Sequence, residues 1–157
     1  MSKKIRWGIL GCGKIANKFA SDLKLVEDAR LSAIASRDAV KLQSFSQQYK
    51  PEFAFNNYEA LVKCAELDAI YVATPHGMHY EHVMLCLKNR KAVLCEKAFA
   101  LNLAHAREMV EFARRQKVFL MEAFWTKFLP QYEKVMDIIR SGTIGEVKLI
   151  QSDFGFK

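Results

Sequence analysis

GILGCGKIANKFA, residues 8–20, joins a short apolar run to a helical pattern near the start of this 157-residue chain. Gly11, Gly13 and Ala16 match the spacing G-x-G-x-x-G/A between a predicted strand and a predicted helix, which is the context of a dinucleotide fingerprint. There the first glycine permits a tight turn, the second lets a pyrophosphate approach the backbone, and the alanine lets the helix lie close to the sheet. Small residues that only allow a tight strand-to-helix turn are the alternative interpretation.

Outside this motif, short apolar runs alternate with longer amphipathic stretches. Strands buried on both faces are predicted at residues 5–10, 30–35, 69–73, 92–95 and 118–122, because these runs are nearly continuous. Helical stripes are predicted for Tyr80, Val83, Met84 and Leu87, for Leu103, Ala106, Val110 and Ala113, and for Phe128, Tyr132, Val135 and Ile139. This alternation predicts an α/β fold with a doubly wound parallel sheet of the Rossmann type.

Three segments are expected along the chain. Residues 1–122 form the dinucleotide-binding domain, and residues 123–145 form a connecting helix packed on it, which Gly142 ends. Residues 146–157, EVKLIQSDFGFK, do not continue the alternation of strands and helices, because their apolar and polar residues alternate. This last segment is predicted to be either a sheet edge or the first strand of a second, truncated domain.

Composition and charge exclude several classes of protein. The N-terminal apolar run is too short for a secretory segment or a membrane span, so a cytoplasmic protein without a membrane partner is expected. The four cysteines include no CxxC pair and are predicted to be free thiols. The net charge is +7, but the basic clusters at residues 88–91 and 114–117 fall where predicted helices end. Because cations there complement the helix dipole, no nucleic-acid partner is expected.

The end of the second predicted strand indicates the cofactor. NAD-binding sheets place an acid there to accept the ribose hydroxyls, about 20 residues beyond the glycines. This chain has Ser36 and Arg37 instead, and a guanidinium suits a 2′-phosphate. Asp38 is predicted to cap the helix that follows. NADP is therefore favoured over NAD, while a solvated Arg37 at a strand end is the alternative.

A metal site is conceivable on the helix predicted to start within TPHGMHYEH, residues 74–82. His79, His82 and Cys86 are spaced by three and then four, which puts them along one stripe. The stripe borders the apolar face, where partly buried histidines and a thiol are ordinary packing. We therefore expect no metal, and His79, nearest the helix start, is the histidine best placed to meet a cofactor or substrate.

Several motifs together resemble a known family. GILGCGKIA (8–16), VATPHGMH (72–79), LCEKAFALN (94–102) and GTIGEV (142–147) are similar to the N-terminal half of the Gfo/Idh/MocA oxidoreductases. MEAFWTKFLP (121–130) resembles the dihydrodiol dehydrogenase-like branch. The resemblance implies NADP-dependent hydride transfer to or from a sugar, polyol or cyclic diol. It also implies homo-oligomeric full-length relatives with a C-terminal α/β domain that this chain lacks, so the chain alone is expected to be inactive. A non-catalytic NADP-binding sensor is the alternative.

The resemblance also assigns roles to residues. Lys97 takes the catalytic role beside the nicotinamide and substrate, and a proline usual in the family is replaced by Ala98. Without the family, Glu96 and Lys97 would be interpreted as an ion pair at a strand end, and Trp125 as a core aromatic. The resemblance implies that the pyrophosphate contacts Gly11, Cys12, Gly13, Lys14 and Ile15, and that the 2′-phosphate contacts Ser36 and Arg37. The adenosine side would contact Thr74, Pro75 and His76, and the nicotinamide region His79, Glu96 and Lys97. The substrate would contact Trp125 and Phe154.

Overall fold

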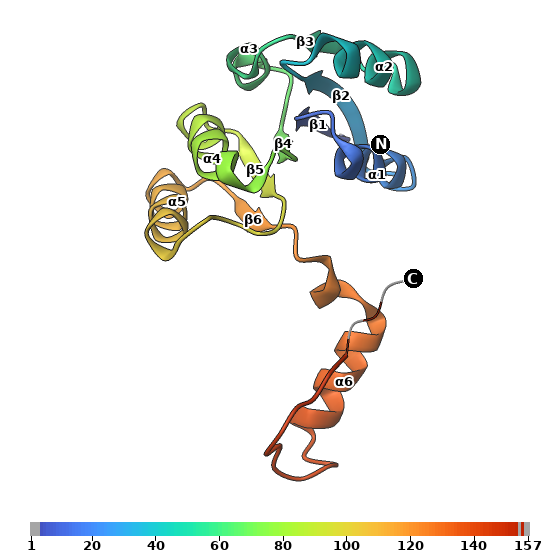
Figure 1. The fold of residues 1–157 in the computed structure, drawn as a ribbon, viewed down its shortest axis with the longest axis vertical. Coiled ribbons are helices and arrows are strands. Elements are labelled where there is room, and N and C mark those ends of the chain that lie inside the picture. The colour runs from blue at the N-terminus through green and yellow to red at the C-terminus, as the bar shows by residue number, and fades with distance from the viewer. Residues whose placement is uncertain (1–3, 154, 156–157) are drawn as a thin grey trace. The chain divides into compact units, whose positions relative to one another are not determined.

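The computed structural model describes residues 4–153 and 155, and in these residues the strands form one six-stranded parallel sheet (Figure 1). The strands are β1 (Ile5–Leu10), β2 (Ala29–Ala35), β3 (Phe53–Phe55), β4 (Ala69–Val72), β5 (Ala92–Cys95) and β6 (Leu120–Glu122). Their order is β3-β2-β1-β4-β5-β6, which reverses between β1 and β4. This is the order of a Rossmann sheet, with its switch point where the two halves meet. The predicted doubly wound α/β fold is confirmed.

Helices cover both faces of the sheet. The helices of this part are α1 (Lys14–Leu23), α2 (Ala39–Tyr49), α3 (Tyr58–Lys63), the 3₁₀ turn η1 (His76–Met78), α4 (His79–Lys88) and α5 (Leu103–Gln116). Ala16 and Ala20 of α1 and Phe45 of α2 pack in one core cluster, and residues of α3, α4 and α5 pack in another. The strands β1, β2, β4 and β5 contribute to both clusters, which explains why their sequences are nearly continuous apolar runs.

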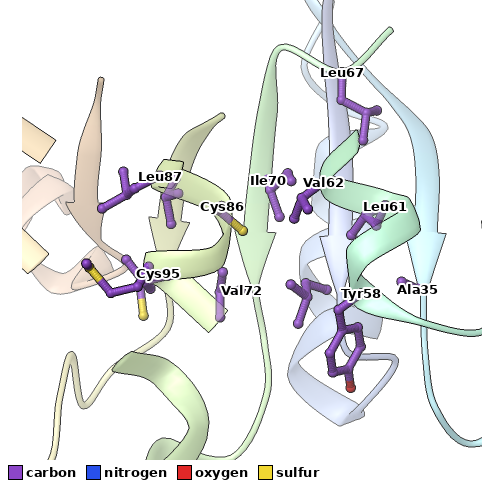
Figure 2. Packing of buried hydrophobic residues seen from close by; sticks show 14 of the residues in the cluster. Ala35, Tyr58, Leu61, Val62, Leu67, Ile70, Val72, Cys86, Leu87 and Cys95 are labelled. Carbon is purple, nitrogen blue, oxygen red and sulfur yellow. The ribbon is translucent and has the colours of Figure 1, made fainter. Parts of the chain in front are cut away.

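The larger cluster lies between the sheet and the helices α3 and α4 (Figure 2). Leu61 of α3, Leu87 of α4, and Ile70 and Val72 of β4 belong to this cluster, and all four are almost fully buried. A leucine-to-alanine change in such a core costs about 2–5 kcal/mol of stability. The cluster therefore fixes β4 and β5, whose carboxyl ends carry several predicted site residues.

Parts of this domain differ from the sequence predictions. The short strand β3 and the helix α3 were not predicted, because a run of three apolar residues bounded by polar ones carries little periodicity. In α5 the predicted stripe is partly wrong, since Leu103 is 71% exposed and Met109 is buried instead. The predicted helix after β2 is confirmed, and Asp38 caps it by accepting a hydrogen bond from the Lys41 N–H at 3.1 Å.

The chain divides into two units, Met1–Ala123 and Phe124–Lys157. The second unit contains the 3₁₀ turn η2 (Trp125–Phe128) and the helix α6 (Pro130–Arg140). Gly142 follows the helix in the left-handed region with φ +71°, as predicted for a residue that ends a helix. The strand predicted from residue 146 is not formed in the described residues 146–153. A strand there would need a neighbouring strand as hydrogen-bond partner.

Two further sequence predictions concern cysteines and membranes. All four cysteines are free thiols, as predicted, and all four are also buried: Cys12, Cys64, Cys86 and Cys95. Within residues 4–153 and 155, each helix is too short or too polar to cross a bilayer.

Candidate functional site

A cleft of about 500 Å³ lies at the carboxyl ends of β1, β2 and β4. Ligands in open α/β sheets bind at this edge, beside the switch point in strand order. The cleft brings together many of the residues predicted to bind a cofactor: Gly11, Cys12, Gly13, Lys14, Ile15, Ser36, Arg37, Thr74 and Pro75. His76, His79, Glu96 and Lys97 do not line it and lie further along the same edge.

The first glycine of the motif is required by the backbone. Gly11 has φ +100°, and a Cβ there would lie 3.1 Å from the carbonyl oxygen of Ala73. Cys12 is buried beside it and directs its thiol to the carbonyl oxygen of Ala35 at 3.7 Å. Burial raises the pKa of that thiol to about 11, so Cys12 adds no charge to the cleft. The turn is therefore tight and uncharged.

The second glycine leaves the floor of the cleft open. A Cβ built at Gly13 would meet no atom within 4 Å, although the residue has an extended conformation that any amino acid adopts. Gly13 is the N-cap of α1 and supplies no side-chain acceptor to the first turn, whereas α2, α3 and α5 begin with an Asp or Asn cap. The first amides of α1 are thus left for an anion, which the helix dipole also favours.

At the end of β2 the cleft is cationic. Arg37 is exposed, and its guanidinium carbon lies 5.3 Å from the centre of the Tyr58 ring. Asp38 is the one carboxylate among the described lining residues, and it faces Lys41, whose Nζ lies 3.2 Å from Oδ2. Hydrogen bonds from the Lys41 backbone and side chain lower the pKa of Asp38. With Lys14, three cations and one carboxylate line the cleft, so its net charge favours a polyanionic ligand.

The loop after β4 is held by two buried histidines. Thr74 Oγ1 lies 2.9 Å from Nδ1 of His82, and burial lowers the pKa of that imidazole. His79 is fully buried, and its ring nitrogens each lie 2.8 Å from a backbone oxygen, of Thr74 and of Ala98. His79 thus connects the loops after β4 and β5. In the residues that the structure describes, no three His, Cys, Asp or Glu side chains gather in a metal-binding arrangement.

Glu96 and Lys97 follow β5, where the Glu96 N–H donates to the carbonyl oxygen of Val72 at 3.0 Å. The Glu96 carboxylate accepts from the Tyr71 hydroxyl at 2.5 Å and from the Lys97 backbone N–H at 3.1 Å. In residues 4–153 and 155, the Lys97 ammonium has no carboxylate partner, so the interpretation as an ion pair is wrong. The peptide bond between Lys97 and Ala98 is cis.

Three residues of this edge, Tyr58, Tyr71 and Glu122, escaped the sequence analysis as site residues, whereas Lys41 is the sequence's second candidate for the 2′-phosphate. Tyr58 and Lys41 line the cleft, and Tyr71 reaches Glu96 from the core. Glu122, at the end of β6, accepts the Phe99 N–H at 2.9 Å and so holds the loop after β5. Only Lys41, three residues beyond Asp38, has a signal in the sequence, because the others act through contacts distant along the chain.

The two residues predicted at the substrate lie in the second unit. Trp125 belongs to η2 and is 71% exposed, so it is not a core aromatic of that unit. Phe154 lies outside the described residues. Their proposed contact with a substrate stays a prediction.

Comparisons with known proteins agree with this geometry. Residues 5–124 match the GFO_IDH_MocA model, described as an oxidoreductase family with an NAD-binding Rossmann fold. Trans-1,2-dihydrobenzene-1,2-diol dehydrogenase of Xenopus tropicalis is 41% identical over 152 residues, which cover 96% of this chain and 46% of the relative. The enzyme of that name from Mus musculus is 41% identical over 154 residues, covering 97% of this chain and 46% of the relative.

A solved structure gives the same picture. A variant of a 3-ketoreductase from Actinomadura kijaniata, in complex with TDP-benzene and NADP, superimposes with a TM-score of 0.85 at 31% identity. The match covers 93% of this chain and 45% of that one. The chain therefore spans about half the length of the curated relatives and of this structure.

Proposed function

Since this chain belongs to the Gfo/Idh/MocA oxidoreductase family, we propose that it is the cofactor-binding part of an NADP-dependent oxidoreductase. The proposed reaction moves a hydride between nicotinamide and a CH–OH carbon of a sugar, polyol or cyclic diol. Relatives named as diol dehydrogenases and a 3-ketoreductase support this substrate class. The observation that carries the choice of NADP is the cationic end of β2, where Ser36 and Arg37 line the cleft.

The residues of the cleft fit such a cofactor. The open surface at Gly13 and the uncapped amides of α1 suit a pyrophosphate. The Arg37 guanidinium presents a planar set of donors that suits the 2′-phosphate, and Lys41 adds a second cation. The carboxylate that would accept ribose hydroxyls is not offered, because Asp38 is engaged as the N-cap of α2.

The chemistry assigned to this chain centres on Lys97. The bound nicotinamide would accept or supply the hydride. The exposed Lys97 ammonium, which no carboxylate in the described residues neutralises, would stabilise negative charge developing on the substrate oxygen. Glu96 holds the backbone before Lys97 through its two hydrogen bonds. A second α/β domain beginning near residue 146 would supply the acid-base partner and the rest of the pocket.

The first prediction is that the chain binds NADPH about 10- to 100-fold more tightly than NADH. The expected gain comes from charge-assisted hydrogen bonds between the 2′-phosphate and the β2 end, which contribute about 1.5–3 kcal/mol. Calorimetric titration with both cofactors at the same ionic strength measures it. Equal affinity, or tighter binding of NADH, would contradict the assignment of NADP.

The second prediction is that Arg37→Ala removes most of this preference by weakening NADPH and leaving NADH nearly unchanged. The 2′-phosphate is the only group that differs between the two ligands, so a loss confined to NADPH reports on that contact. Arg107→Ala is the matched control, because Arg107 is exposed on α5 and does not line the cleft. Preserved selectivity in Arg37→Ala would assign the phosphate to another cation, with Lys41 tested next.

A further inference from the structure

Tyr71 is an aromatic core residue with a polar function at its tip. It lies in β4, is 2% exposed, and its ring stacks on Phe19 of α1 with centroids 4.0 Å apart and planes 16° from parallel. Phe19 in turn meets the edge of Trp7 at 5.4 Å. Phe19 of α1, itself held by Trp7 of β1, therefore fixes the Tyr71 ring, and with it the position of the hydroxyl.

The hydroxyl reaches from this core to the carboxyl end of β5. It donates to Oε1 of Glu96 at 2.5 Å, while the Lys97 N–H donates to Oε2. Burial, and next the hydrogen bond to Glu96, raise the pKa of Tyr71 far above its ordinary value. The phenol therefore keeps its proton throughout the range in which proteins are folded and remains a donor to Glu96.

We propose that Tyr71 is a positioning residue, which fixes the Glu96 carboxylate and the adjoining Lys97 backbone for the nicotinamide half of the cofactor. The inference deepens the proposed function and rests on it. Phe19 belongs to α1, the helix whose first amides face the cleft, so one aromatic stack supports both the pyrophosphate loop and the end of β5. Glu96 and Lys97 lie beside the strand that contributes Tyr71, since Val72 pairs with Cys95.

The experiment compares a whole cofactor with its adenosine half. Tyr71→Phe keeps the ring and its stacking and removes only the hydroxyl. We expect the Kd for NADPH to rise about tenfold, a change of about 1.4 kcal/mol. The Kd for 2′,5′-ADP, which lacks the nicotinamide half, should stay within about twofold on the same scale. Loosening of the whole fold would weaken both ligands alike.

The chain offers a matched control. Tyr80→Phe removes a hydroxyl that donates to Glu108 at 2.8 Å, also a tyrosine–carboxylate hydrogen bond, but on the exposed surface of α4 and α5. It should change neither Kd. Equal weakening of both ligands by Tyr71→Phe, or no change in either, would overturn the positioning role.

A second measurement needs no cofactor. Urea unfolding of wild type, Tyr71→Phe, Glu96→Ala and the double variant tests whether the two side chains are coupled. We expect the double variant to lose less stability than the two single losses added together, because either change alone breaks the shared hydrogen bond. Additive losses would refute the positioning role whatever the cofactor does. If the losses are coupled but the wild-type chain does not bind NADPH, the positioning of Glu96 stands and the proposed function is refuted instead.

Discussion

Gly13→Asp is expected to weaken NADPH binding by at least about 100-fold, about 2.7 kcal/mol, while the protein stays folded. An aspartate at the N-cap of α1 would accept hydrogen bonds from the first-turn amides that a pyrophosphate would otherwise use. Its charge would also repel the phosphates at close range. No atom lies within 4 Å of the new Cβ, so the midpoint of thermal unfolding should stay level or rise slightly. Calorimetric titration and thermal unfolding of the same preparation measure the two effects.

Two companion variants separate the causes in the Gly13→Asp experiment. Gly13→Ser caps the same amides without a charge, so the difference between the two variants isolates electrostatic repulsion. Gly11→Ala should lose stability as well as binding, because its Cβ would lie 3.1 Å from a backbone oxygen at φ +100°. Wild-type affinity for NADPH in Gly13→Asp would show that the pyrophosphate binds elsewhere.

The sheet was predictable because its strands are buried on both faces. Continuous apolar runs such as AIYV at 69–72 leave no room for another interpretation once helical stripes separate them. The glycines of the phosphate loop were predictable for a different reason, since Gly11 adopts a backbone conformation that other residues rarely tolerate. β3 was missed because three residues are too few to show a period.

The site residues that could be predicted are those placed by the strand or helix next to them in the sequence. Arg37 follows a strand end directly, so its place at the cleft could be read from the sequence. Tyr71 acts on Glu96, 25 residues away, and Tyr58 stacks near Arg37 across two segments. His79 is buried and hydrogen-bonded to two loops, which the sequence did not indicate, and its expected place near the nicotinamide stays a prediction. Such roles depend on tertiary contacts that periodicity and spacing do not encode.

The helix of the second unit also shows that local sequence patterns predict an element but not its tertiary contacts. The spacing of Tyr132, Val135 and Ile139 identified α6, and the helix is present. Tyr132 and Val135 are 40% and 52% exposed, so the stripe that reveals the helix does not reveal what it packs against. An amphipathic period shows that one face of a helix is apolar, but it does not identify the surface that covers this face.

The chain of residues 1–157 is expected to bind NADP(H) but to turn over no sugar, polyol or cyclic diol. Within the described residues, the Lys97 ammonium has no hydrogen-bond or ion-pair partner that could serve as its acid-base group. Hydride transfer also requires a positioned substrate and a site closed to water. The chain covers 46% of the length of its dehydrogenase relatives, which leaves much of such a pocket to other residues. Absorbance of reduced nicotinamide, followed with a panel of substrates, measures turnover.

The assay needs a positive and a negative reference to be decisive. The Mus musculus relative with the diol of its name serves as the active control under identical conditions, and Lys97→Ala serves as the inactive one. The expected rate of the chain is at least about 1,000-fold below the 1 per second usual for enzymes, and indistinguishable from Lys97→Ala. If the chain instead turned over at about 1 per second and Lys97→Ala abolished that rate, residues 1–157 would hold a whole active site. The proposal of a second domain that completes the site would then be wrong. The acid-base group would have to be sought on this edge of the sheet, starting with Glu96 and Glu122, which hydrogen-bond to the backbone of the loop after β5.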